Sequence, residues 1–198
     1  MTEFDIKERF LSAGIENAPW EARLLLENLS GKALADAVER RCAGYPLQYL
    51  IGEWGFYRET YEVSEDCLIP RSDTEILVEK AALLLPQNAK FLDLCTGSGC
   101  ITWTMALEKP GACVTAVDIS DDALAVASTQ DFADEIQQTG ALSPEFVKAD
   151  VLSDDLADII SNEIKDEEGK SIQQFDLLLS NPPYVMDKEK SLMRTNVL

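Results

Sequence analysis

The stretch "FLDLCTGSGCITWTMALEKPGACVTAVD", residues 91–118, contains two short apolar runs, a turn with two glycines and a helical segment. "FLDLC" and "ACVTAVD" predict two strands, and "CITWTMALEK" between them predicts a helix. Two strands joined through a helix are typical of a right-handed crossover within a parallel sheet. The stretch therefore predicts an α/β fold.

The alternation of strands and helices continues after residue 118. Residues 121–138 predict one helix with Ser120 as its N-cap, and "EFVKAD" and "FDLLLS" predict two further strands. We expect four parallel strands in the order 3-2-1-4, which leaves "FDLLLS" at an edge. Ligands of such sheets bind beyond the carboxyl ends of the strands.

The chain before residue 90 has a different pattern. Apolar residues at helical spacing around Leu25 and again after Ser30 predict a small antiparallel helical bundle over residues 1–52. "EWGFYRETYEV" predicts a β-hairpin within a linker, residues 53–72. Ser72 and Glu75 form the S-x-x-E pattern of a capping box, which predicts the start of a helix. We expect residues 73–198 to form the α/β domain.

Composition restricts the class of protein. The formal net charge of the 198 residues is -19 without a dense Lys/Arg cluster, which disfavours nucleic acid as a partner. Five cysteines lack C-x-x-C spacing and histidine is absent, so we expect no metal site. The charged N-terminus and the lack of a span-length apolar run predict a cytoplasmic protein without membrane contact.

The glycine turn "DLCTGSGC", residues 93–100, is the first candidate site. Gly97 and Gly99 would let the backbone turn sharply and approach a ligand closely. A dinucleotide fingerprint needs a third glycine where this chain has Thr102, and a P-loop needs a G-K-[ST] ending, which is missing. A turn of this kind has a purely structural role as often as it binds a ligand.

Two aspartates follow the next strands. Asp118, roughly twenty residues beyond the glycines, can accept both hydroxyls of a ribose. Asp150 lies within reach of an adenine amino group in the same arrangement. The alternatives are an N-cap role for Asp118 and an exposed loop carboxylate for Asp150.

The third candidate is "SNPPYV", residues 180–185, directly after the last predicted strand. Pro182 and Pro183 directly follow Asn181 and restrict the backbone there, so that its carboxamide points in one direction. This pattern at a strand end is far more specific than a glycine turn or a lone aspartate. The three clusters together indicate a nucleoside cofactor without a diphosphate, which is S-adenosylmethionine.

At these residues the sequence resembles a known family. "DLCTGSG", "AVD" and "NPPY" are similar to the class I methyltransferases that methylate a planar nitrogen. "GYPLQYLIGEWGFY" and "CLIPRSDTEIL" resemble the release factor glutamine methyltransferases, and the likeness runs from about residue 18 to residue 184. The sequence departs from that family at Ser72, where many members have proline, and at Cys95, where other methyltransferases have glycine.

The resemblance implies a Rossmann-like class I methyltransferase fold that converts S-adenosylmethionine to S-adenosylhomocysteine. It implies methylation at N5 of the glutamine in the Gly-Gly-Gln loop of a release factor, which the helical front would dock. The implied catalytic residues are Asn181, Pro182, Pro183 and Tyr184. The implied cofactor-binding residues are Cys95, Thr96, Gly97, Ser98, Gly99, Asp118, Asp150, Val151 and Asn181, and no metal is implied.

Three further expectations concern the end of the chain and the alternatives. By resemblance the family's sheet continues past "NPPY", so we expect a C-terminally truncated form with little or no turnover. We expect this form either to self-associate through residues 175–179 or to leave residues 187–198 poorly ordered. An adenine-N6 nucleic-acid methyltransferase would use the same "NPPY", but it must flip a base and bind phosphates. The other alternative is a non-catalytic adenosyl-binding module.

Overall fold

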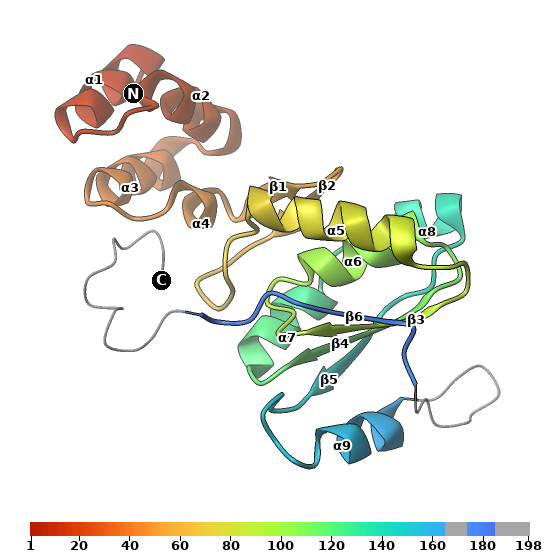
Figure 1. Ribbon diagram of the computed structural model, residues 1–198. Helices are drawn as coiled ribbons and strands as arrows, with labels where there is room; N and C mark the ends of the chain where they lie inside the picture. Colours follow the sequence, from red (N-terminus) through yellow and green to blue (C-terminus); the bar gives the residue numbers. More distant parts are fainter. Residues whose placement is uncertain (165–173, 185–198) are drawn as a thin grey trace. The chain divides into compact units, whose positions relative to one another are not determined.

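The computed structural model describes residues 1–164 and 174–184, which divide between two compact units, Met1–Glu53 and Trp54–Tyr184 (Figure 1). The first unit contains the helices α1 (Glu3–Ser12), α2 (Ala18–Asn28), α3 (Gly31–Cys42) and α4 (Leu47–Ile51). Their apolar faces form a separate core around Phe10, Leu25 and Val38. The two helical patterns predicted from sequence are α2 and α3.

A partly buried ion pair joins α2 to α3 in the first unit. Arg41 donates from Nε and Nη2 to the two carboxylate oxygens of Glu21, at 2.5 and 2.9 Å. Glu21 is only 7% exposed, so loss of Arg41 would leave the buried Glu21 carboxylate uncompensated. The pair therefore contributes to the register between the two helices.

The second unit begins with the predicted hairpin, which the structure confirms. Strands β1 (Glu53–Phe56) and β2 (Glu59–Glu62) pair with each other, and Tyr57 in the turn has a φ of 58°. A left-handed residue suits a two-residue hairpin loop because its twist matches that of the strands. Phe56 and Tyr61 are buried in the main core, so the hairpin packs as part of this unit.

The central sheet confirms the predicted topology. It contains β3 (Lys90–Leu94), β4 (Cys113–Asp118), β5 (Glu145–Lys148) and β6 (Leu177–Ser180). The order β5-β4-β3-β6 is the predicted 3-2-1-4, and all three pairings are parallel. Leu94 pairs with Val117 on one side and with Ser180 on the other, so the carboxyl ends of three strands meet at one edge.

Both faces of the sheet are covered by helices (Figure 1). One face packs Phe91, Val114 and Leu179 against α5 (Ser72–Leu84), α6 (Cys100–Glu108) and the segment around α8 (Ala133–Thr139). The opposite face packs Leu92 and Val117 against α9 (Leu156–Glu163). Apolar residues on both faces explain why these strands show continuous apolar runs and not alternation.

The prediction of a single helix over residues 121–138 is wrong. The structure has α7 (Asp121–Ser128) and α8, separated by a break at residues 129–132. Within the break the side chain of Gln130 is buried and bonded to the backbone of Glu62 and Ser98. These distant partners outweigh the local helical pattern.

The predicted capping box at Ser72 is also wrong. The N-cap of α5 is Arg71, and no side chain makes a capping hydrogen bond there. Glu75 instead accepts a hydrogen bond at 3.1 Å from the backbone N–H of Tyr57 in the hairpin turn. The Glu75 carboxylate, which the S-x-x-E pattern assigned to the N-terminus of α5, therefore joins α5 to the hairpin.

The part of the chain that the structure describes has no helix both long and apolar enough to cross a bilayer. It also has no group of three or more cysteine or carboxylate side chains that could hold a metal ion.

Candidate active site

The glycine turn lies directly after β3 and before α6. Cys95, Gly97 and Gly99 have φ angles of 62°, 55° and 79°, all in the left-handed region. A Cβ on Gly99 would lie 3.0 Å from the Cβ of Ala127, so this glycine is required for packing. A Cβ on Gly97 would meet no heavy atom within 4 Å, so open space lies over its backbone. A ligand can approach the chain at Gly97.

Cys95 occupies a left-handed position that costs a residue with a Cβ roughly 1 kcal/mol. Burial raises the pKa of the Cys95 thiol, and the nearby negative charge of Asp118 raises it further. The side chain is therefore neutral at physiological pH.

Asp118 connects the end of β4 to the glycine turn. Its Oδ2 accepts from the backbone N–H of Gly97 at 2.9 Å, and its Oδ1 accepts from the N–H of Ser120 at 3.0 Å. A carboxylate offers about four acceptor positions, so both oxygens can still accept a ribose hydroxyl. Ser120 caps α7 by accepting from Ala123 N–H at 3.2 Å, which confirms the predicted N-cap.

Asp150 and Val151 follow the end of β5. The N–H of Ala149 donates to the carbonyl of Asp118 at 3.0 Å, which continues the β4–β5 pairing and brings Asp150 to the same edge of the sheet. Asp150 is exposed, and its Oδ1 accepts from Leu152 N–H. Its second oxygen is available to a ligand, while Val151 is half-buried.

The structure also places an acidic group that the sequence analysis missed. Asp93 on β3 is 0% exposed, and its Oδ2 accepts from the hydroxyls of Thr96 and Thr102 at 2.8 and 2.7 Å. Its Oδ1 is buried without a hydrogen-bond partner among the described residues. Burial raises the pKa of Asp93 to about 6. A lone carboxylate inside the apolar run "FLDLC" was the available signal.

The raised pKa of Asp93 predicts a pH-dependent stability. The folded protein binds this proton more tightly than the unfolded chain, so the contribution is complete below about pH 4 and is lost as pH rises through 6. We expect the free energy of unfolding of D93N to gain roughly 2 kcal/mol relative to the wild type between pH 4 and pH 7. Urea unfolding of both proteins across this range measures the difference, and parallel curves would contradict the prediction.

Gln130 is a second residue that the sequence analysis missed. Its carboxamide accepts from Glu62 N–H at 2.8 Å and donates to the carbonyls of Glu62 and Ser98 at 2.9 and 3.1 Å. One side chain therefore holds the hairpin to the glycine turn, in which Ser98 is 2% exposed. No local pattern marks a glutamine for such a role.

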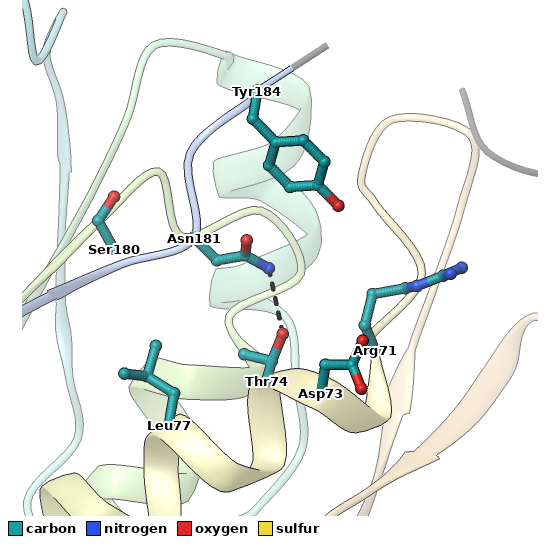
Figure 2. Close-up of a pocket in the computed structure, with 7 residues that line it drawn as sticks. All are labelled: Arg71, Asp73, Thr74, Leu77, Ser180, Asn181 and Tyr184. Carbon is teal, nitrogen blue, oxygen red and sulfur yellow. Dashed lines mark hydrogen bonds between the residues drawn. The ribbon is translucent and has the colours of Figure 1, made fainter. Parts of the chain in front are cut away.

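The residues after β6 line a cavity of about 290 Å³ (Figure 2). Ser180 donates to the carbonyl of Leu94 at 2.8 Å, which holds the end of β6 beside the glycine turn. Asn181 Nδ2 donates to Thr74 Oγ1 at 3.1 Å, and Figure 2 shows the Asn181 oxygen on the side away from that bond. Arg71, Asp73, Thr74, Leu77, Ser180, Asn181 and Tyr184 line the cavity.

The structure brings the predicted acceptor residues and cofactor residues to the same sheet edge, but of all these residues only Asn181 and Tyr184 line the cavity. Asn181 is half-buried, whereas Pro182, Pro183 and Tyr184 are exposed. Tyr184 is 79% exposed with its ring at the cavity. The cavity residues contributed by α5 and its N-cap were not assigned a role from sequence, although the "CLIPRSDTEIL" element that contains them was noticed.

The sheet order, the glycine turn after the first strand and the carboxylate after the second define the class I methyltransferase fold. Residues 72–197 match the methyltransferase small domain family. The chain therefore belongs to this family.

The chain is also similar to curated proteins of one kind. It is 38% identical to a release factor glutamine methyltransferase of Chlorobaculum tepidum, over 89% of this chain and 57% of that protein. It is 40% identical to one of Koribacter versatilis, over 82% of this chain and 51% of that protein. These matches confirm the resemblance seen in the motifs, and the chain spans little more than half the length of these relatives.

Among solved structures, the chain is similar to the release factor-specific protein-(glutamine-N5) methyltransferase of Alicyclobacillus acidocaldarius. The identity is 33%, the TM-score is 0.33, and the match covers 66% of this chain and 60% of that one.

Proposed function

We propose that this chain transfers a methyl group from S-adenosylmethionine to the N5 side-chain nitrogen of the glutamine in the Gly-Gly-Gln loop of a release factor. The observation that carries the proposal is the anchored carboxamide of Asn181, whose oxygen has no hydrogen-bond partner among the described residues and lies beside a cavity at the carboxyl end of the sheet. The named activity of the relatives supports the choice of substrate.

The substrate amide would be held by two acceptors. The oxygen of Asn181 and the main-chain carbonyl of Pro182 would each accept one N–H of the substrate glutamine. Both oxygens stabilise the positive charge that grows on nitrogen as the methyl group arrives. The exposed ring of Tyr184 can cover the flat amide once it is bound.

S-adenosylmethionine supplies a methyl group on a sulfonium, and the carbon–sulfur bond breaks as the carbon–nitrogen bond forms. The nitrogen then carries one proton too many, and this N-protonated amide is acidic enough to release its proton to water. A dedicated base is not needed, which agrees with a sequence that contains no histidine. The main task of the site is therefore to position the substrate.

The residues after β3, β4 and β5 fit the nucleoside part of the cofactor. The open face of Gly97 accepts close contact, and Asp118 retains acceptor positions for the ribose hydroxyls. Asp150 has one oxygen available for the adenine amino group. The surrounding backbone is formed by Cys95, Thr96, Ser98, Gly99 and Val151, and Asn181, directly after β6, borders the site.

Methylation with radiolabelled S-adenosylmethionine tests the proposal. The acceptors are a release factor, the same factor with Gly-Gly-Ala in its loop, and an adenine-containing DNA duplex. We expect label only on the intact factor. Label on DNA would favour the adenine-N6 alternative, and binding of S-adenosylhomocysteine without any transfer would favour a non-catalytic module; either result contradicts the proposal.

We also propose that the helical unit Met1–Glu53 contacts the body of the release factor. Because the substrate would be a release factor, we propose that the reaction takes place in the cytoplasm. Phe4 and Trp20 of this unit are 65% and 52% exposed, and aromatic side chains are enriched at interfaces. Intact release factor should then have a higher kcat/KM than a short Gly-Gly-Gln peptide. Equal values would contradict docking by this unit.

A further proposal is self-association through β6. This strand lies at an edge of the described sheet, and Leu178 is 52% exposed. The unpaired N–H and C=O groups of an edge strand can pair with a strand of another chain, and a lysine on the edge strand opposes this pairing. We expect a light-scattering mass above 21.9 kDa for the wild type and close to it for L178K. L83K, which changes an exposed leucine on α5, serves as the control. A monomeric wild type would contradict the proposal.

A further inference from the structure

We propose that Thr74 is a positioning residue that sets the orientation of the Asn181 carboxamide for catalysis. The inference rests on the proposed function, in which the oxygen of Asn181 accepts an N–H of the substrate. Thr74 lies in the first turn of α5, far from Asn181 in sequence, and the structure brings Thr74 Oγ1 within 3.1 Å of Asn181 Nδ2.

The orientation of Asn181 matters because the two ends of a carboxamide have opposite hydrogen-bonding character. The oxygen only accepts and the NH₂ group only donates, and rotation by half a turn exchanges them. With the oxygen facing the cavity, the side chain can accept from a substrate amide. With the NH₂ group facing the cavity, two donors would meet and the substrate could not be held.

Thr74 selects the productive orientation by binding the NH₂ end. Its side chain is 7% exposed, and a backbone hydrogen bond from Thr74 N–H to the carbonyl of Arg71 holds the residue in the first helical turn. In Figure 2 the bond leads from Asn181 down to Thr74 on the helix, and the Asn181 oxygen lies on the opposite side. The contact therefore holds the NH₂ group on Thr74 and leaves the oxygen of the carboxamide facing the cavity.

The hydrogen bond of the Thr74 hydroxyl to Asn181 differs from the usual one for a threonine in a helix. Threonine in a helix commonly hydrogen-bonds to the backbone of its own preceding turn. Here its oxygen accepts from a residue 107 positions away, at the end of a different element. Loss of the hydroxyl would leave the half-buried NH₂ group without this partner, and both orientations of Asn181 would become populated.

The test compares T74V, which keeps the branched shape but has no hydroxyl, with T74S, which keeps the hydroxyl. We expect T74V to lower kcat for methylation of release factor by about five-fold to thirty-fold. The affinity for S-adenosylhomocysteine should stay within about two-fold, because the cofactor residues are untouched. T74S should restore kcat to near the wild-type value. T115V, a change at a buried threonine on β4, serves as the control.

Two further measurements separate positioning from a general structural role. In an N181A background, T74V should cause no additional loss of kcat, because Thr74 acts through Asn181. By NMR, the side-chain amide protons of Asn181 should exchange with solvent more slowly than those of the exposed Asn162, and T74V should remove this protection.

Equal losses in T74S and T74V, additive losses with N181A, or Asn181 protons that exchange as fast as those of Asn162 would each overturn the inference. The NMR readout needs no turnover. An inactive wild type would therefore contradict the proposed function, whereas the NMR measurement would still show whether Thr74 sets the orientation of Asn181.

Discussion

Replacement of Asn181 by alanine is expected to reduce kcat/KM for methylation of release factor by about a hundred-fold or more. In the proposed function, the variant loses the acceptor that would hold the substrate nitrogen and stabilise the charge that develops on it. That interaction is strongest in the transition state, so the loss belongs in the rate and not in cofactor binding. Initial rates with radiolabelled cofactor, together with calorimetric binding of S-adenosylhomocysteine, measure the two quantities separately.

N162A is the matched control for this experiment. Asn162 is exposed on α9, on the face of the sheet opposite α5, and its removal should leave both quantities unchanged. If N181A still methylates release factor at close to the wild-type rate, the account of the amide-binding site is wrong. A parallel loss of cofactor affinity would instead place Asn181 mainly in the cofactor site.

Replacement of Asp118 by alanine is expected to weaken cofactor binding about ten-fold or more, because hydrogen bonds to a charged group contribute on the order of 1.5–3 kcal/mol. The structure adds a second reason. Asp118 accepts from the N–H groups of Gly97 and Ser120, so the variant also loses the bonds that hold the glycine turn against β4. Titration calorimetry with S-adenosylhomocysteine measures the effect.

D122A is the control for charge. Asp122 is an exposed residue in the first turn of α7, and its removal changes the net charge equally without touching the glycine turn. A thermal melt of each variant establishes that the fold is retained. Unchanged affinity in D118A would remove Asp118 from the cofactor site, and an equal loss in D122A would attribute the effect to net charge.

Local patterns were sufficient for most of the fold. The four strands, their parallel order and the hairpin followed from apolar runs, turn residues and the rules for right-handed crossovers. The position of the candidate site followed as well, because parallel strands place their carboxyl ends at a single edge. The roles of the individual site residues remain predictions that the variants above can test.

Local patterns failed where a side chain has a distant partner. Gln130 interrupts the predicted helix because its carboxamide binds Glu62 and Ser98, and Glu75 leaves the capping box for the N–H of Tyr57. A periodicity argument weighs only neighbours within a few turns, so contacts between remote segments are invisible to it.

The sequence by itself determined the class of fold, the family and which strand ends meet at the candidate site, because periodicity and short motifs are local properties of the chain. Only the tertiary structure decided how the site is prepared. It buried Asp93 with one oxygen that has no partner in the described part of the chain, bound Asp118 to Gly97, and placed Thr74 against Asn181. Each depends on residues brought together by packing of the helices and strands, and the orientation of a carboxamide or the pKa of a carboxyl group follows from those surroundings.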